Sequence, residues 1–293
     1  MSIGKLAALL SAAVLAGWLG TGCSAGPGDH RETPGLVVGS KHDPTSQLLA
    51  GVYLAALRSY GFTARAETVD DPMAQLDSGA VTVTPAFTGQ TLQALQPGAA
   101  AVTSDAQVYR AMVSALPEGV AAGDYTTAAE DKPVLLVTQP TAKAWGGQDR
   151  SADLSALPKH CDGLVVGIVA GHRAPSAIGG CKLPTPREFP DGTTMFAAIR
   201  AGQLTAGWTT TADPAIPGDL VALADGKPAL IRAENVVPLY RRNALTDRQV
   251  LAINEVAGVL DTSALADMRR QVAGGADAVA VAGGWLAEHP LGR

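Results

Sequence analysis

Strand-like and helix-like segments alternate along most of this chain, and this alternation constrains the fold more than any other feature. A short apolar strand at 36–38 precedes a helical pattern of apolar residues from Leu48 to Tyr60, which Gly61 ends. A second strand, Phe62–Val69, and a short helix opened by Asp71 follow. Strands that alternate with helices predict α/β layers with mostly parallel sheets.

The same alternation continues into the second half of the chain. The expected strands are 133–138, 164–170, 204–211, 220–223 and 236–240; the expected helices include 108–116, 152–157 and 195–201. Three helical stretches then close the sequence. With 47% apolar and 17% charged residues, the chain is large enough for two lobes.

The first 22 residues predict a signal peptide. Lys5 precedes an apolar run from Leu6 to Leu19, which is 14 residues long and too short to span a bilayer comfortably. The run ends in LGTGC, which resembles a bacterial lipoprotein processing site, with Gly20 where a bulky aliphatic residue is usual. We therefore expect lipidation of Cys23. The alternative is an ordinary signal peptide with an incidental cysteine.

Residues 23–35 predict a lipid anchor followed by a polar tether rich in glycine and proline. The mature chain would then lie on the extracytoplasmic face of the cell membrane, anchored by acyl groups, and we expect a monomer. Removing Lys5 takes the formal charge from −5 to −6. An acidic chain without a basic run argues against nucleic acid as a partner.

Two cysteines remain after Cys23 is set aside. Cys161 and Cys181 form an even pair in an oxidising compartment, which favours a disulfide. The alternative is a zinc site completed by His160 and His172, but the spacing lacks the short turns that preorganise such sites. We expect no metal and no cofactor.

The stretch VTVTPAFTGQTL, residues 81–92, begins as a strand and could end in the start of a helix. Open α/β sheets bind ligands beyond the carboxyl ends of their strands. One interpretation therefore places Phe87, Thr88 and Gly89 in a ligand site, with free N–H groups at Gln90–Thr91 facing a polar or anionic ligand group. The alternative is that Phe87 is a core ring and Gly89 a plain turn.

A hydrolytic enzyme is the alternative from a different class. His172 and Ser176 lie four residues apart and Asp213 is available, but no Gly-x-Ser-x-Gly turn exposes a nucleophile. We do not expect an enzyme.

Three longer stretches carry a resemblance to a known family. They are VVGSKHDPTSQLLAGVYLAAL, SGAVTVTPAFTGQTL, and AAIRAGQLTAGWTTTADPAIPGDLVALAD followed by NVVPLYRR. In this order they resemble the substrate-binding proteins of osmoprotectant ABC importers, which take up glycine betaine, choline and related solutes. The resemblance covers the chain from about Leu36 to Leu291.

The resemblance implies a two-lobed type II periplasmic-binding-protein fold with two interlobe crossings. The first lobe would combine residues 36–138 with 235–293, and the second would hold 139–234. The crossings would lie near Val137–Pro140 and Arg232–Val237. A solute would bind in the cleft, closure of the cleft would trap it, and an inner-membrane permease with its ATPases would be the partner.

The family's ligand residues carry over only in part. The resemblance places Lys41, Phe87, Gln90, Asp131, Arg173, Trp208, Thr210 and Asp213 at or near the ligand, together with Thr88 and Gly89. Thr84 and Thr210 stand where the family has tyrosines, and Gln90 stands where it has a threonine. Most aromatic residues fall on the faces of expected helices or strands and are assigned to the core. The aromatics that remain are candidates for a cage around a quaternary ammonium group: Phe87, Tyr125, Trp145, Phe189 and Trp208.

Where threonine and glutamine replace tyrosines, the site loses affinity for a cation and gains hydrogen-bonding capacity. We therefore expect a small polar or zwitterionic solute, with betaine-like compounds as the leading candidates. A lipoprotein that serves as a sensor subunit or an envelope scaffold would share the same fold and is the remaining alternative.

Overall fold

The computed structural model describes residues 35–98, 102–146 and 153–292. The predicted signal peptide, Cys23 and all of the predicted tether except Gly35 lie outside the described residues. Within the described ranges, no helix combines the length and the hydropathy needed to cross a membrane.

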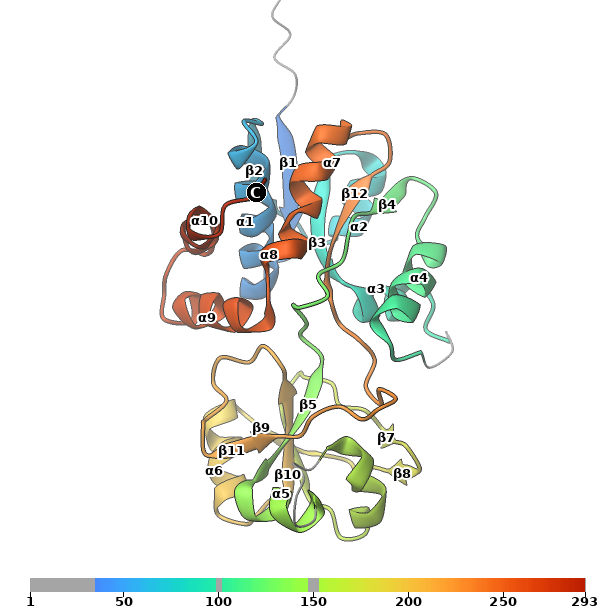
Figure 1. Cartoon of the computed structure of the whole chain (residues 1–293), viewed down its shortest axis with the longest axis vertical. Coiled ribbons are helices and arrows are strands. Elements are labelled where there is room, and N and C mark those ends of the chain that lie inside the picture. The colour runs from blue at the N-terminus through green and yellow to red at the C-terminus, as the bar shows by residue number, and fades with distance from the viewer. Residues whose placement is uncertain (1–34, 99–101, 147–152, 293) are drawn as a thin grey trace, which may run out of the picture. The chain divides into compact units, whose positions relative to one another are not determined.

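The first sheet contains strands from both halves of the sequence. Its order is β2-β1-β3-β12-β4, and β12 runs antiparallel between β3 and β4. The bounds are β1 Leu36–Ser40, β2 Ala64–Thr68, β3 Val83–Phe87, β4 Val120–Ala122 and β12 Val236–Arg241. Figure 1 shows the orange β12 beside the much earlier β3. Because β1 is parallel to β2 and β3, their carboxyl ends share one edge of the sheet.

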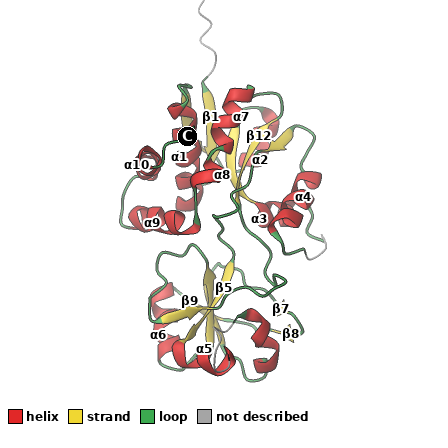
Figure 2. Cartoon of the chain, in the orientation of Figure 1, coloured by secondary structure: helices red, strands yellow, loops and turns green. Residues whose placement is uncertain are grey.

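Helices flank this sheet (Figure 2). They are α1 Pro44–Ser59, α2 Pro72–Ser78, α3 Thr88–Leu95, α4 Asp105–Ala115, α7 Asp247–Asn254, α8 Val256–Val259, α9 Thr262–Ala273 and α10 Ala278–Glu288. The predicted helix after Asp43-Pro44 is confirmed as α1, which is buried on nearly all sides from Leu48 to Leu57. It packs closely on α10, because a Cβ at Gly51 would lie 2.9 Å from the Cβ of Ala282.

The second sheet has the order β11-β5-β10-β6-β9. The bounds are β5 Pro133–Thr138, β6 Val166–Val169, β9 Arg187–Phe189, β10 Ala206–Thr210 and β11 Leu220–Ala222. The flanking elements are α5 Gln139–Gly146, the 3-10 helix η1 Leu154–His160 and α6 Gly192–Arg200. Two core clusters lie on this sheet, one around Trp208 and one around Phe196.

The expected disulfide is present. Cys161 is bonded to Cys181, and their Cα atoms are 5.6 Å apart. The bond ties the end of η1 to the small hairpin of β7 (Ala177–Ile178) and β8 (Cys181–Lys182). Closing a loop of this length stabilises the fold by about 3 kcal/mol in the chain-entropy model.

The predicted boundary between the lobes at residue 138 is wrong. β5 pairs with β10 and β11, so residues 133–138 belong to the second sheet and the first crossing lies near Glu130–Lys132. An apolar run such as PVLLVT fits either sheet equally well, because burial on both faces leaves no pattern that identifies the sheet. The chain returns to the first sheet at β12, and the two crossings touch where the Asp131 N–H donates to the Glu234 carbonyl at 2.9 Å.

Candidate functional site

A cavity of about 640 Å³ lies at the carboxyl edge of the first sheet. This volume is typical of sites for small molecules. The residues that line it are Lys41, Asp43, Thr45, Ser46, Leu49, Asp71, Pro72, Met73, Thr84, Pro85, Ala86, Phe87, Gln90, Thr91, Ala94, Leu95, Asp131, Gly171, His172 and Leu239. Most of them come from the ends of β1 and β3 and from the first turns of α1, α2 and α3, as expected for a sheet of this type.

Helices α1 and α2 begin at this cavity, and each is capped by an aspartate of its own. The Asp43 carboxylate accepts a hydrogen bond from the Ser46 N–H at 2.8 Å. The Asp71 carboxylate accepts from the N–H groups of Met73 at 3.1 Å and Ala74 at 3.2 Å. These side chains satisfy N–H groups that have no partner within the helix.

Helix α3 has no such cap of its own, and Glu234 supplies it from the second crossing. The Gln90 N–H donates to Glu234 Oε2 at 2.8 Å, across 144 positions of sequence. A Cβ at Gly89 would lie 2.5 Å from Glu234 Oε1, so only glycine leaves room for this carboxylate. Burial raises the pKa of the Glu234 carboxyl to about 7, against the lowering effect of the Gln90 N–H and of Arg232.

The prediction of free N–H groups at the start of α3 is therefore wrong. The Thr88 N–H donates to the Asn235 carbonyl at 3.0 Å, and Glu234 takes the next two N–H groups. Thr88 itself is buried, and its hydroxyl accepts from the Asn235 N–H at 3.1 Å. Thr88 and Gly89 thus fasten α3 to the second crossing, and neither lines the cavity.

Four of the predicted ligand residues do line the cavity: Lys41, Phe87, Gln90 and Asp131. Phe87 is half-buried at the end of β3, with one side against the core of the first sheet. Asp131 is held in the first crossing, where it pairs with Arg269 of α9 at 3.0 Å and accepts from the Ala212 N–H at 3.2 Å. Arg269 also donates to the Ala212 carbonyl at 2.9 Å.

The other four predicted residues do not line it. Trp208 is 1% exposed and packs in the core of the second sheet, so its predicted place in the cage is wrong. Thr210 follows it on β10, and Asp213 accepts from the Thr209 hydroxyl and the Ala215 N–H. Arg173 is exposed beside the cavity residue His172. Side chains alternate between the two faces of β10. Trp208 lies on the face that packs with the apolar residues of α5 and η1, because burial of its large ring is favourable.

The remaining cage candidates lie elsewhere. Tyr125 packs on Tyr109 with ring centroids 4.7 Å apart, and Trp145 stacks on His160 at 5.1 Å. Phe189 packs against the second core cluster of its sheet. Among the described residues, Phe87 is thus the one aromatic that lines the cavity.

The two alternatives that involved His172 find no support in the geometry. The disulfide removes both thiols from the zinc set, and no group of three metal ligands occurs in the described ranges. No hydrogen bond joins His172, Ser176 and Asp213 within the described part of the chain. His172 itself lines the cavity.

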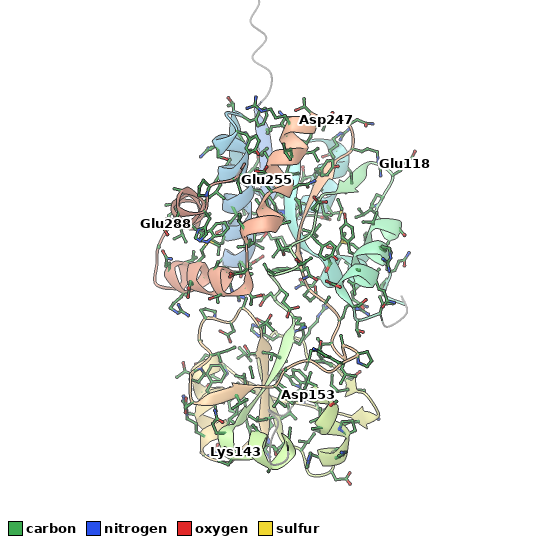
Figure 3. All side chains as sticks on the ribbon, in the orientation of Figure 1. Glu118, Lys143, Asp153, Asp247, Glu255 and Glu288 are labelled. Atoms are coloured by element: carbon green, nitrogen blue, oxygen red, sulfur yellow. A yellow bond between two sulfur atoms is a disulfide. The ribbon has the colours of Figure 1, made fainter. Side chains whose placement is uncertain are left out.

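Glu234 was not among the predicted ligand residues, although its position just before the VVP strand placed it in the expected second crossing. The sequence contained one signal, a glycine at the start of an expected helix, which can mark the close approach of another group. In the structure Gly89 is not in the left-handed conformation, and the group that approaches it is Glu234. Charged residues such as Glu118, Lys143 and Glu288 are exposed on the outside of the molecule (Figure 3), whereas Glu234 is partly buried against α3.

The family comparison decides the class of protein. Residues 34–288 match the model of the substrate-binding domain of the ABC-type glycine betaine transport system (OpuAC). The chain belongs to this family. No curated protein sequence matches it.

Solved structures agree on the fold. A glycine betaine/carnitine/choline ABC transporter protein superposes with a TM-score of 0.70 at 17% identity, covering 87% of this chain and 98% of the other. Apo YehZ from Escherichia coli gives 0.66 at 17% identity, covering 88% and 99%. A choline-binding ABC transporter protein in complex with choline gives 0.53 at 14%, covering 87% and 88%. The expected type II binding-protein fold is confirmed, and as a family member the chain delivers a solute to an ABC importer.

Proposed function

We propose that the cavity binds a small solute that carries a quaternary ammonium group. The observation that carries this proposal is the lining itself, which contains one aromatic ring, Phe87, three aspartates and one lysine, Lys41. The match to the family of glycine betaine transport systems supports the same class of solute.

Charge contributes more to this recognition than the aromatic ring. One exposed cation–π contact is worth only about 0.5–1 kcal/mol, so Phe87 alone gives weak binding. Asp131 is paired with Arg269, whereas Asp43 and Asp71 are exposed and cap helices. Two carboxylates and a ring face can hold an ammonium group without the full aromatic cage that the resemblance implied.

Transport would follow from movement about the two crossings. The predicted cleft closure requires the two crossing segments to stay together. They are joined by the hydrogen bond from the Asp131 N–H to the Glu234 carbonyl and by the bridge between Glu130 and Asn235. The partner is an ABC permease with its ATPases. We further propose that the protein acts as a monomer, anchored by lipid at Cys23 on the extracytoplasmic face.

Thermal denaturation against a panel of solutes tests this function. The panel contains choline, glycine betaine, carnitine, ectoine, amino acids and small sugars. A ligand at 100 times its Kd stabilises the fold by about 2.7 kcal/mol, which shifts Tm by roughly 5–10 °C in a domain of this size. We expect such a shift with at least one quaternary ammonium compound.

A matched pair of variants assigns the binding to the cavity. Phe87→Leu removes the ring face that lines it, and we expect Kd to rise about two- to fivefold. Phe62→Leu is the control, because Phe62 lies against Arg248 at 5.7 Å and outside the cavity lining. Shifts with sugars or amino acids alone would refute the proposed solute class, and no shift with any compound would favour the sensor or scaffold alternative.

A further inference from the structure

Three helices begin at the cavity, and protein carboxylates occupy the first turn of each. Asp43 caps α1 and Asp71 caps α2, and each aspartate directly precedes its helix in the sequence. Glu234 caps α3 from the opposite end of the sequence. Helix N-termini with free N–H groups are the usual receptors for a ligand carboxylate. At this cavity those receptors already hold the protein's own negative charges.

The place of Glu234 at α3 is fixed from several sides. Its Oε2 accepts the Gln90 N–H at 2.8 Å, and its Oε1 lies over Gly89, where a Cβ would come within 2.5 Å. Its carbonyl accepts the Asp131 N–H at 2.9 Å, so the backbone is held as well. A ligand carboxylate could reach these N–H groups only by displacing a side chain that is anchored at both ends.

The cations near the start of α3 offset this carboxylate only in part: Arg232 lowers the pKa of Glu234 less than burial raises it, and Lys41 is the lysine in the cavity lining. Arg232 lies in the same crossing but donates to the Gln93 side chain at 2.6 Å, and Arg269 is engaged by Asp131 and the Ala212 carbonyl. The cavity wall formed by Phe87, Gln90 and Asp131 therefore stands next to two carboxylates. A second negative charge brought there by a ligand meets like charges, which is costly across an interface.

We propose that Glu234 is a specificity-determining residue that makes the cavity select organic cations over zwitterions that carry a carboxylate. Its own carboxylate takes the position at α3 that the carboxylate of a betaine would otherwise occupy. This inference rests on the proposed function and narrows it from quaternary ammonium solutes in general to those without an acid group, such as choline.

Isothermal titration of the purified protein with three probes tests the inference. The probes are choline, glycine betaine and glycine betaine methyl ester, which keeps the skeleton of betaine but masks its negative charge. We expect choline and the ester to bind at least about tenfold more tightly than betaine at pH 8. Equal affinity for betaine and its ester would overturn the inference while leaving the proposed function intact.

Variants then assign the discrimination to Glu234. Glu234→Gln keeps an acceptor for the Gln90 N–H and removes the charge, and we expect the ratio of betaine Kd to choline Kd to fall about tenfold or more. Glu234→Ala opens the N–H groups of α3 and should lower the ratio further. Glu118→Gln is the control, because Glu118 is exposed and does not line the cavity; its ratio should stay within about threefold of wild type.

The outcomes separate the two proposals. A ratio that persists in both Glu234 variants would overturn the role of Glu234. If none of the three probes binds wild-type protein, the proposed function fails and this inference fails with it. Circular dichroism of each variant shows whether it is folded at the titration temperature, and the wild-type comparison of betaine with its ester needs no variant at all.

Discussion

At the scale of single residues, Glu234 accepts a hydrogen bond from the Gln90 N–H, but its carboxylate is buried at a cost in free energy. Its pKa is raised from 4.5 to about 7 because burial disfavours the charged form. Arg232 and Asp131 are the charged neighbours, the first lowering and the second raising this pKa. Since the folded pKa lies above the unfolded one, Glu234 favours folding when protonated, and this contribution is lost as pH rises from about 4.5 to about 7.

Glu234→Gln should therefore become more stable relative to wild type as pH rises. We expect the difference in free energy of unfolding between variant and wild type to grow by about 2–3 kcal/mol from pH 4.5 to pH 8, because each unit of pKa shift corresponds to about 1.4 kcal/mol. Urea denaturation at a series of pH values measures it. Glu118→Gln, at an exposed position, is the control and should change the difference by less than about 0.5 kcal/mol. A flat difference across this range would show that Glu234 remains charged in the fold.

Only part of the site could be predicted residue by residue. Phe87 and Gln90 follow from their place at the end of a strand, because β3 has a readable apolar pattern and a helix directly after it. The contact of Glu234 with Gln90 joins residues 144 positions apart, and no local pattern reports it. Trp208 was misplaced because alternation gives two faces of a strand without saying which one meets the cavity.

At the scale of elements, β10 is the central strand of the second sheet and Trp208 is its largest buried side chain. The ring packs among Leu135, Val166 and Leu223, and it is 1% exposed. Its removal leaves a large apolar void that the surrounding strands cannot fill.

Trp208→Ala should therefore lower stability and leave ligand affinity intact. We expect a loss of about 3–5 kcal/mol in the free energy of unfolding, measured by urea denaturation. Trp145→Ala is the control, since Trp145 is only half-buried and should cost less. A Trp208 variant that kept its stability but lost choline binding would return this residue to the ligand site.

Periodicity predicted most elements but not their assignment to sheets. Helix α1, strand β3 and strand β10 lie where the apolar patterns placed them, and Gly79 ends α2 in the left-handed conformation as a glycine stop does. β5 was assigned to the wrong lobe because its run of buried residues carries no sign of its partners. The two-residue strands β7 and β8 are too short for any period to reveal.

At the scale of the whole molecule, the proposed lipid at Cys23 determines where the protein works. Cys23→Ala removes the acyl acceptor, so we expect the variant to leave the membrane fraction while keeping its affinity for choline. Immunoblots of membrane and soluble fractions measure the distribution, and Ser24→Ala is the matched control. Equal membrane association of Cys23→Ala and wild type would exclude anchoring through this cysteine.

The first sheet takes its strands from both ends of the described chain, and this has a consequence for synthesis. β12 separates β3 from β4, and α10 covers the face of α1 at Gly51. Nearly the whole polypeptide must therefore emerge before the sheet with β1 and β12 can close its interior, whereas the segment from β5 to β11 is continuous and can close earlier. A premature stop before β12 would release a chain in which the sheet of β5, β6, β9, β10 and β11 is assembled, while the first sheet is incomplete and α1 is exposed. Such a chain would be a substrate for proteases and not a weaker transporter subunit.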